Sequence, residues 1–123
     1  MNRFLFLAAG GLAGTFARYF LSVWIGRAQN SDFPYHTLAV NLAGCFILGA
    51  FIGFDKIKML GHEWKLFAAA GFCGAFTTFS TLMMETAVLA EKGQAVPGLL
   101  NILISTAAGY LLFHLGLWAA RIF

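Results

Sequence analysis

The sequence predicts an all-α integral membrane protein in which four helices cross the bilayer. Of its 123 residues, 60% are hydrophobic and only 11% are charged, whereas soluble domains are typically about 45–50% apolar and about 25% charged. The mean hydropathy of the chain is +0.79. Because each crossing needs about 20 mainly apolar residues, four crossings with short links occupy almost the whole chain. We therefore expect one transmembrane domain, residues 1–123, with spans at about 4–25, 36–54, 66–90 and 96–120.

Composition and charge argue against several other classes of protein. The net charge of +3 is small and spread along the chain, so we expect no partner among the nucleic acids. The sequence holds no Ser/His/Asp set, no run of metal-ligating residues and no phosphate-binding loop. With no room left for a soluble domain, we expect a protein that is not an enzyme. The cysteines, Cys45 and Cys73, fall in apolar spans, where a small buried hydrophobe is the ordinary interpretation.

The first span carries a charge on a face of small residues. Its apolar run continues to about residue 25 and is too long for a cleaved signal peptide. Gly10, Gly14 and Arg18 are spaced by four and share one helix face. The two glycines form a small-xxx-small pair that permits close approach of another helix. Arg18 either faces a cavity or a partner, or extends its charged end to the membrane interface.

The second span carries the amide of Asn41 one to two turns into the membrane. Amides at that depth often hold helices together by hydrogen bonds. The same group also has N–H donors to offer to an anion. Both interpretations of Asn41 remain open from the sequence.

The third span contains the stretch GFCGAFTTFST, residues 71–81, and there we expect the helix to break and restart. Two glycines three apart are followed by four hydroxyl residues in five positions. Glycine and threonine are poor helix formers, and hydroxyls compete for backbone groups. A break leaves unpaired carbonyls and N–H groups, which at membrane depth need protein, water or an ion as partner. The alternative is a continuous helix whose small polar residues pack against neighbours.

Two further polar features extend this pattern. Glu85 lies four residues after Thr81 on the same helix face, either along a pathway or near the interface. In the fourth span Asn101, Ser105 and Gly109 recur every four residues. This narrow polar stripe is typical of a water path or of a helix contact.

The polar residues inside the membrane favour passage of a small anion. Hydroxyls and amides donate hydrogen bonds without carrying charge, so an anion can exchange water for them and leave again. A helix that restarts after Thr77 adds N–H groups and a partial positive charge. Carbonyls at the break suit a hard cation such as sodium. The ring edge of Phe79 is the positive part of its quadrupole and can face an anion.

Three stretches resemble one known family, the Fluc (CrcB) fluoride channels. They are residues 71–81 (GFCGAFTTFST), 14–19 (GTFARY) and 37–44 (TLAVNLAG). The spans match in length and order, so the resemblance covers nearly the whole chain. It implies a passive, fluoride-selective channel that lowers cytoplasmic fluoride, located in the cell inner (plasma) membrane. It also implies an antiparallel, dual-topology homodimer with two fluoride pores and one structural sodium ion at its centre.

The resemblance implies roles for individual residues. The backbone carbonyls of Gly74 and Thr77 correspond to the sodium ligands. Arg18 and Glu85 correspond to the vestibule of the pore. The residues that correspond to the fluoride pore are Asn41, Phe79, Ser80, Thr81, Asn101 and Ser105.

Two residues depart from the family pattern, and the loop charges fit dual topology poorly. The family usually has a second pore phenylalanine where this chain has Leu82, and a serine where it has Gly109. Each pore would then keep one ring, from Phe79, and its selectivity or rate could differ from the family norm. Five basic residues of the loops and ends fall on one side and two on the other. By the positive-inside rule both termini would be cytoplasmic.

Two other classes of protein remain to be compared with the channel. A small four-helix proton-coupled multidrug exporter has the same size and would also be dimeric, but it needs an acid in the first span, where this chain has Arg18. An assembly subunit without transport of its own would use the hydroxyls only for packing. Ion flux through the purified protein in liposomes separates the three.

Overall fold

The structure is a computed structural model that describes residues 2–58 and 60–122, and its regular elements are all helical. Their order is α1 (Asn2–Arg27), α2 (Tyr35–Lys58), α3 (His62–Lys65), the π-helix η1 (Leu66–Cys73), α4 (Gly74–Phe76), α5 (Phe79–Glu91) and α6 (Ala95–Ala119). Four helical units are long and apolar enough to cross a membrane, the third being His62–Glu91. The prediction of four spans with a broken third helix is confirmed. The assignment of the whole chain to one transmembrane domain stays a prediction.

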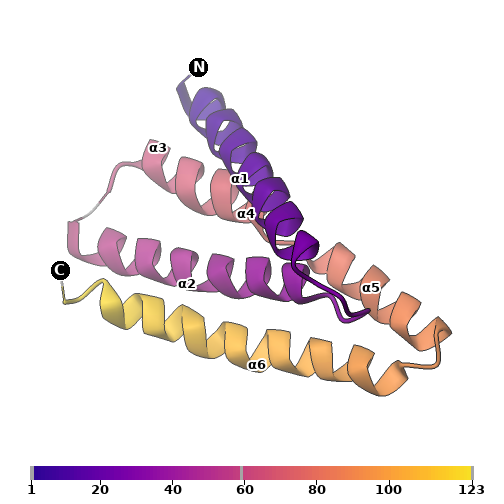
Figure 1. Cartoon of the computed structure of the whole chain (residues 1–123). Helices are drawn as coiled ribbons and strands as arrows, with labels where there is room; N and C mark the ends of the chain where they lie inside the picture. Colours follow the sequence, from indigo (N-terminus) through magenta and orange to yellow (C-terminus); the bar gives the residue numbers. More distant parts are fainter. Residues whose placement is uncertain (1, 59, 123) are drawn as a thin grey trace.

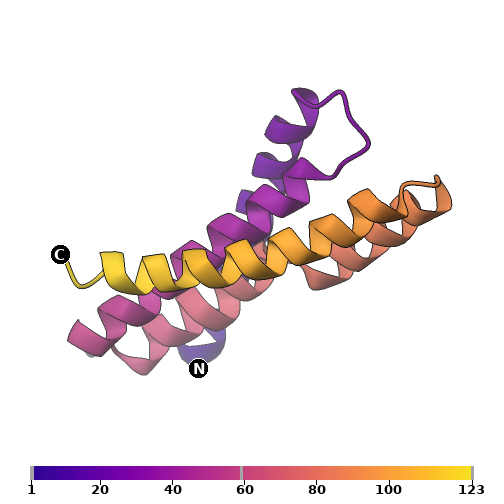
Figure 2. The same cartoon turned by 90° about the horizontal axis from the view of Figure 1, so that it is seen from below.

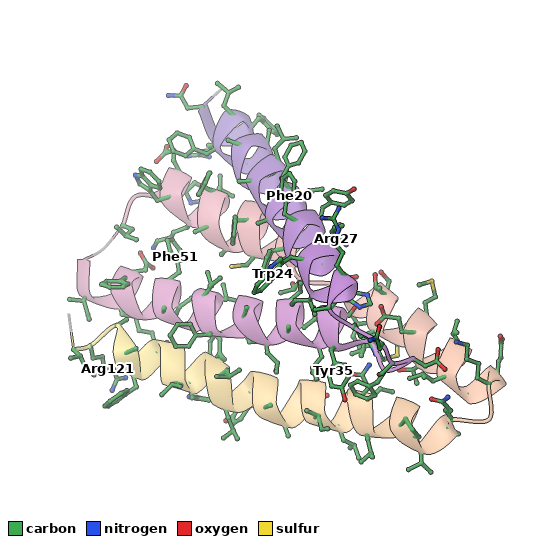
Figure 3. All side chains as sticks on the ribbon, viewed as in Figure 1. Phe20, Trp24, Arg27, Tyr35, Phe51 and Arg121 are labelled. Carbon is green, nitrogen blue, oxygen red and sulfur yellow. The ribbon has the colours of Figure 1, made fainter. Side chains whose placement is uncertain are left out.

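Helices α2 and α6 form a parallel pair, and glycines bring their backbones together. A Cβ atom on Gly49 would collide with the carbonyl group of Phe113, and one on Gly116 with the carbonyl of Phe46. Figure 1 shows the two helices side by side, and in Figure 2, seen from below, α6 passes in front of α2. In Figure 3, Tyr35 marks the start of α2 and Arg121 the end of α6, at opposite ends of the pair.

Helix α1 packs against the first half of the third span through its small-residue face. A Cβ on Gly10 would collide with the carbonyl of Phe67, and one on Gly14 with that of Phe72. From the other side, a Cβ on Gly71 would lie 2.8 Å from the Leu7 carbonyl oxygen. The close approach predicted for the Gly10–Gly14 pair is confirmed, and its partner is η1.

The third span exchanges partners at its break. Before the break, η1 and α4 lie against α1; after it, α5 lies against α6. Figure 1 shows α3 and α4 beside α1, and α5 beside the start of α6. A tight turn at Lys92–Gln94 reverses the chain between α5 and α6, with Gly93 at a φ of 76°, which glycine adopts without steric cost. The break therefore directs the two halves of one span to different neighbours.

The π-helix before the break was not predicted. In η1 the backbone bonds reach five residues instead of four, and such segments are rare and frequently found at functional sites. The stretch LFAAAGFC is almost uniformly apolar. Since no polar residue marks a face, its sequence cannot distinguish the wider π turn from an α turn.

The outer surface of the helices is apolar, as a bilayer requires. Phe20 and Trp24 of α1 are both exposed on the single chain, Trp24 over 73% of its surface. Large side chains buried inside the single chain are few, including Val40, Leu82 and Leu89. Lipid, or a second protein surface, is the environment that these exposed side chains need.

Candidate functional site

The break in the third span consists of Thr77 and Thr78, which both have extended backbone angles. Thr77 has φ −84° and ψ 158°, and Thr78 has φ −149° and ψ 115°. Thr77 ends the first half of the span by donating both its N–H (3.0 Å) and its hydroxyl (2.8 Å) to the Cys73 carbonyl. Thr78 begins the second half as N-cap of α5, where its hydroxyl oxygen accepts from the Thr81 N–H at 3.2 Å. Each end of the break is thus closed by a threonine hydroxyl.

Asn41 braces the break from α2. Its Oδ1 accepts from the Thr78 N–H at 2.8 Å, and its Nδ2 donates to the Thr78 carbonyl at 3.1 Å. The amide side chain therefore satisfies both backbone groups of the one residue that has left the helix. An amide has two N–H hydrogens, so one donor of Asn41 is not used by this pairing.

Gly44, one turn further along α2, leaves the space that the break occupies. A Cβ atom there would collide with Cγ2 of Thr77 and lie 3.2 Å from Cδ1 of Phe76. Any larger residue at this position would push the break away from α2. Asn41 and Gly44 therefore act on neighbouring residues of the same break, one by bonding and the other by leaving room.

Two carbonyls lose their helical partners at the break. In a continuous helix the Gly74 carbonyl would accept from the Thr78 N–H, and the Thr77 carbonyl from the Thr81 N–H. Those two N–H groups donate instead to Asn41 Oδ1 and to the Thr78 hydroxyl. Gly74 is exposed on the surface of the single chain and Thr77 is half-buried. The two carbonyls are thus available to a cation, and carbonyl oxygen is a ligand type that hard cations accept.

A hollow of about 380 Å³, which we name the central hollow, lies beside the break. Asn41 and Ser105 contribute polar groups to its lining from α2 and α6. Phe79 lines it from the first residue of α5 and remains 74% exposed, whereas Leu82 is only 5% exposed. Gly74 and Thr77 complete its lining on the side of the break.

A second hollow of about 340 Å³, the arginine hollow, lies on the other side of Thr78. The half-buried Arg18 of α1 lines it together with Thr81 of α5. The Thr81 hydroxyl lies 2.8 Å from that of Thr78, and Thr78 lines both hollows. The Ser80 hydroxyl is exposed and lies 3.5 Å from the Thr78 hydroxyl. Hydroxyls therefore connect a basic hollow with the central one.

Glu85 lies at a third hollow of about 320 Å³, the outer hollow, near the loop between α1 and α2. Its Oε1 accepts from the Thr37 hydroxyl at 2.6 Å and lies 3.2 Å from His36 Nε2. Its Oε2 is buried and has no hydrogen-bond partner among the described residues. The sequence left Glu85 as either a pathway or an interfacial residue, and the structure ties it to the start of α2.

Asn101 and Ser105 are neighbours on α6, but only Ser105 reaches the central hollow. Asn101 is fully buried, its Oδ1 lies 3.5 Å from the Ser105 hydroxyl, and its Nδ2 has no partner within the part of the chain that the structure describes. At Gly109, one turn beyond Ser105, a Cβ would lie 3.2 Å from Cys45 Sγ. The stripe predicted on α6 thus divides into a hollow-lining hydroxyl, a buried amide and a packing glycine.

The comparisons with known proteins identify the family. Residues 5–117 match the family described as CrcB-like protein, Camphor Resistance (CrcB). The chain belongs to the CrcB family. The Fluoride-specific ion channel FluC of Acidobacterium capsulatum is 40% identical over 116 residues, which are 94% of this chain and 93% of that protein. Proteins of the same name from Shewanella amazonensis and Rhodospirillum rubrum are each 37% identical, with coverage of 94% and 92% of both chains.

Membership of the CrcB family confirms the resemblance seen in the three stretches of sequence. It agrees with a multi-pass membrane protein of four candidate spans. Among residues 2–58 and 60–122, no group of three or more His, Cys, Asp or Glu side chains is placed to hold a metal ion.

Sequence reasoning missed three residues of the site in this CrcB chain: His36, Thr37 and Gly44. Thr37 lies four residues before Asn41 on the same face of α2, which was a signal for a shared lining. Gly44 lies three residues after Asn41, and a small residue so close to a polar one is only a weak indication of a site. His36 gave no signal, because its contact with Glu85 joins residues that are distant in sequence.

Proposed function

We propose that this protein is a fluoride-specific channel through which fluoride leaves the cytoplasm passively. The observation that carries the proposal is the near-complete coverage of the chain by relatives named Fluoride-specific ion channel FluC. The two hollows that meet at Thr78 support it, because a basic hollow beside a hydroxyl-lined break is suited to an anion.

The proposed path begins in the arginine hollow. Arg18 attracts the anion there without trapping it, because the hydroxyls of Thr78 and Thr81 offer neutral donors next to it. The start of α5 adds the N–H groups and the positive end of a helix. Beyond Thr78 the anion meets the central hollow, with the Phe79 ring and the Ser105 hydroxyl.

Other proposed pore residues contribute from the edges of this path. Asn41 lines the central hollow, and its bonds to Thr78 leave one of its N–H groups unused. Ser80 is exposed on the first turn of α5, where a second chain can approach it. Asn101 has a buried N–H donor that finds no partner among the described residues, and such a donor favours an acceptor nearby. Glu85 and Arg18 form the proposed vestibule.

We further propose that the carbonyls of Gly74 and Thr77 hold a structural sodium ion. Two observations support this site. The N–H groups that would pair with these carbonyls in a continuous helix donate instead to Asn41 and to the Thr78 hydroxyl, and Gly74 is exposed. Sodium would supply charge that balances the two carbonyl dipoles. One chain offers few ligands for an ion, so a second copy that presents the same carbonyls across a two-fold axis is part of the proposal. In the proposed homodimer the copies are antiparallel, and Phe79 and Gly74 lie on the contact face.

Ion efflux from liposomes that hold the purified protein tests the proposed function. We expect fluoride to be released rapidly once a potassium ionophore balances the charge, while chloride is released far more slowly. Liposomes without protein provide the background rate. Equal rates for fluoride and chloride would contradict fluoride selectivity. Cation uptake coupled to proton release, without fluoride flux, would favour the exporter instead.

A further inference from the structure

His36 stands at the boundary between two hollows of the site. It is the one described residue that lines both the arginine hollow and the outer hollow. Glu85 lines only the outer hollow, and Arg18 only the arginine hollow. The imidazole therefore lies where an anion from the loop side would pass towards the arginine.

Polar groups of two neighbouring residues of α2 approach a single oxygen of Glu85. The Thr37 hydroxyl donates to Oε1 at 2.6 Å, and His36 Nε2 lies 3.2 Å from the same atom. Thr37 lines the arginine hollow, whereas His36 reaches into the outer hollow as well. The carboxylate is thus held by a hydrogen bond from Thr37 and by a close contact with His36, and of these two residues only His36 lines the outer hollow.

The charges around this contact make the position of the carboxylate important. Arg18 is half-buried across the arginine hollow and has no acidic partner within 4 Å among the described residues. On the outer side, Asp32 is already paired with Lys92 at 2.7 Å. Arg18 is thus an unpaired cation of the site within the described residues, and a Glu85 carboxylate that paired with it would remove the charge that attracts the anion.

We propose that His36 is a positioning residue for anion passage, which keeps the Glu85 carboxylate turned to the outer hollow and away from Arg18. This role rests on the proposed fluoride conduction. It adds a residue to the path that acts through Glu85 rather than by touching the anion. Loss of the contact with His36 Nε2 leaves the hydrogen bond from Thr37, which lines the arginine hollow, to hold Glu85.

Fluoride efflux from two variants of similar side-chain size tests the proposal. His36→Leu lacks a donor and should slow efflux by roughly tenfold, a usual size for coupling between two sites. His36→Gln keeps an N–H donor and should restore most of the rate. His114→Ala is the matched control, because His114 is exposed on α6 beside Tyr110 and Phe113 and far along the chain from the site. Size-exclusion elution shows that each variant is folded.

The double variant His36→Leu/Glu85→Gln separates positioning from packing. A neutral amide gains little from Arg18, so the double variant should match Glu85→Gln alone. Efflux from His36→Leu equal to that of the unmodified protein would overturn the proposal. So would a loss that persists in the double variant relative to Glu85→Gln. An unmodified protein that releases no fluoride would reject the channel function itself, and this role with it.

Discussion

Asn41 replaces the backbone partner that Thr78 loses when it leaves the helix. Its two hydrogen bonds, at 2.8 Å and 3.1 Å, satisfy the N–H and the carbonyl of the same residue. Inside a bilayer, an unpaired backbone group costs several kcal/mol, of order ~4–8 for transfer to a medium without partners. The amide thus offsets the cost of breaking the helix inside a bilayer.

The two hydrogen bonds between Asn41 and Thr78 predict that Asn41→Asp loses both fluoride efflux and stability. The carboxylate still accepts from the Thr78 N–H, but it has no donor for the Thr78 carbonyl and faces that oxygen with negative charge. We expect fluoride efflux to stop and the protein to lose about 1–3 kcal/mol of stability. Efflux and thermal unfolding in detergent measure the two effects. A stable Asn41→Asp protein with normal efflux would place Asn41 outside the pathway.

Gly44 predicts a defect of purely steric origin. A Cβ in Gly44→Ala collides with Thr77 and crowds Phe76, so the break must shift and efflux should fall at least tenfold. The matched control is Gly11→Ala, because a Cβ on Gly11 meets nothing within 4 Å. Since alanine is the better helix former by roughly 0.5–1 kcal/mol, this control should be as stable as the unmodified chain or more so. Equal efflux from both variants would show that the break tolerates displacement.

The sequence predicted the types of residue in the site better than their contacts. The hydroxyl cluster and Asn41 were recognised because polar groups in an apolar span are costly and therefore conspicuous. The hydrogen bond between Thr37 and Glu85 joins residues 48 apart in the chain, so no local sequence pattern predicts it. Whether Asn41 holds the backbone or donates to an anion was equally undecided, and depended on where Thr78 lies.

The elements of the third span show a different limit of sequence reasoning. Its break at Thr77 and Thr78 was predicted from propensity and hydroxyl competition, and it is confirmed. The π-helix before it was not predicted, because eight apolar residues carry no mark of helical period. The third span packs against α1 before the break and against α6 after it. This change of partner could not be predicted from the sequence either, because it depends on which glycines face which backbone.

The first turn of α5 predicts the effect of changing its ring residues. Phe79 is exposed at the central hollow, whereas Leu82, at the usual second ring position, is nearly buried. We expect Phe79→Ile to abolish or severely slow fluoride efflux while the protein still elutes normally. Leu82→Phe should keep efflux but cost about 1–3 kcal/mol if its closed site does not relax. Normal efflux from Phe79→Ile would assign the ring to packing and leave the hydroxyls as the path.

The loop between α1 and α2 is tied to the turn before α6 by a pair that depends on pH. The Lys92 ammonium, 2.7 Å from Asp32, donates a hydrogen bond and with its charge lowers the pKa of that carboxyl below its ordinary value of 3.8, and Gln94 adds a second donor. Because the folded-state pKa is lowered, this stabilisation is fully present above the unfolded-state pKa and is lost as pH falls through the folded-state pKa. The protection of residues 28–34 against hydrogen exchange, relative to the intrinsic exchange rate at each pH, should therefore fall as pH drops below about 3.8. Asp32→Asn should show low protection both above and below that pH. An unmodified loop whose protection does not change as the pH falls below that value would contradict the tie.

At the scale of the whole molecule, a single chain has too small an interior to bury all the residues of the proposed site. Phe79 and Gly74 are both exposed on the single chain, although they lie at the hollow proposed for ions. Oligomers are commonly closed by a two-fold axis, which would place these residues against their own copies. For the antiparallel homodimer, that axis must lie in the membrane plane.

Dual topology predicts labelling from both sides of the membrane. Gly61→Cys, in a background with Cys45 and Cys73 replaced by alanine, places one thiol at an exposed position between α2 and α3. An impermeant thiol reagent should label part of it from outside and the rest only after the membrane is opened. Asn30→Cys, in the loop at the other end of the helices, should give the same divided result. Labelling of each site from a single, opposite side would reject the antiparallel dimer, and would agree with the five-to-two bias of basic residues.

The parallel pairing of α2 and α6 has a consequence for how the protein is made. The glycines that join them, Gly49 and Gly116, are separated in the chain by the whole third span and by most of α6. While the ribosome is still producing the chain, α1 and the first half of the third span can pack together. The face of α2 that carries Gly49 has no helix to pack against until α6 is made. Because chains fold from the N-terminus during synthesis, the last helix to be inserted supplies both the partner of α2 and the partner of α5. A truncation that removes the last helix therefore leaves two unfinished surfaces, and quality-control proteases should clear such a chain faster than one that lacks only its final few residues.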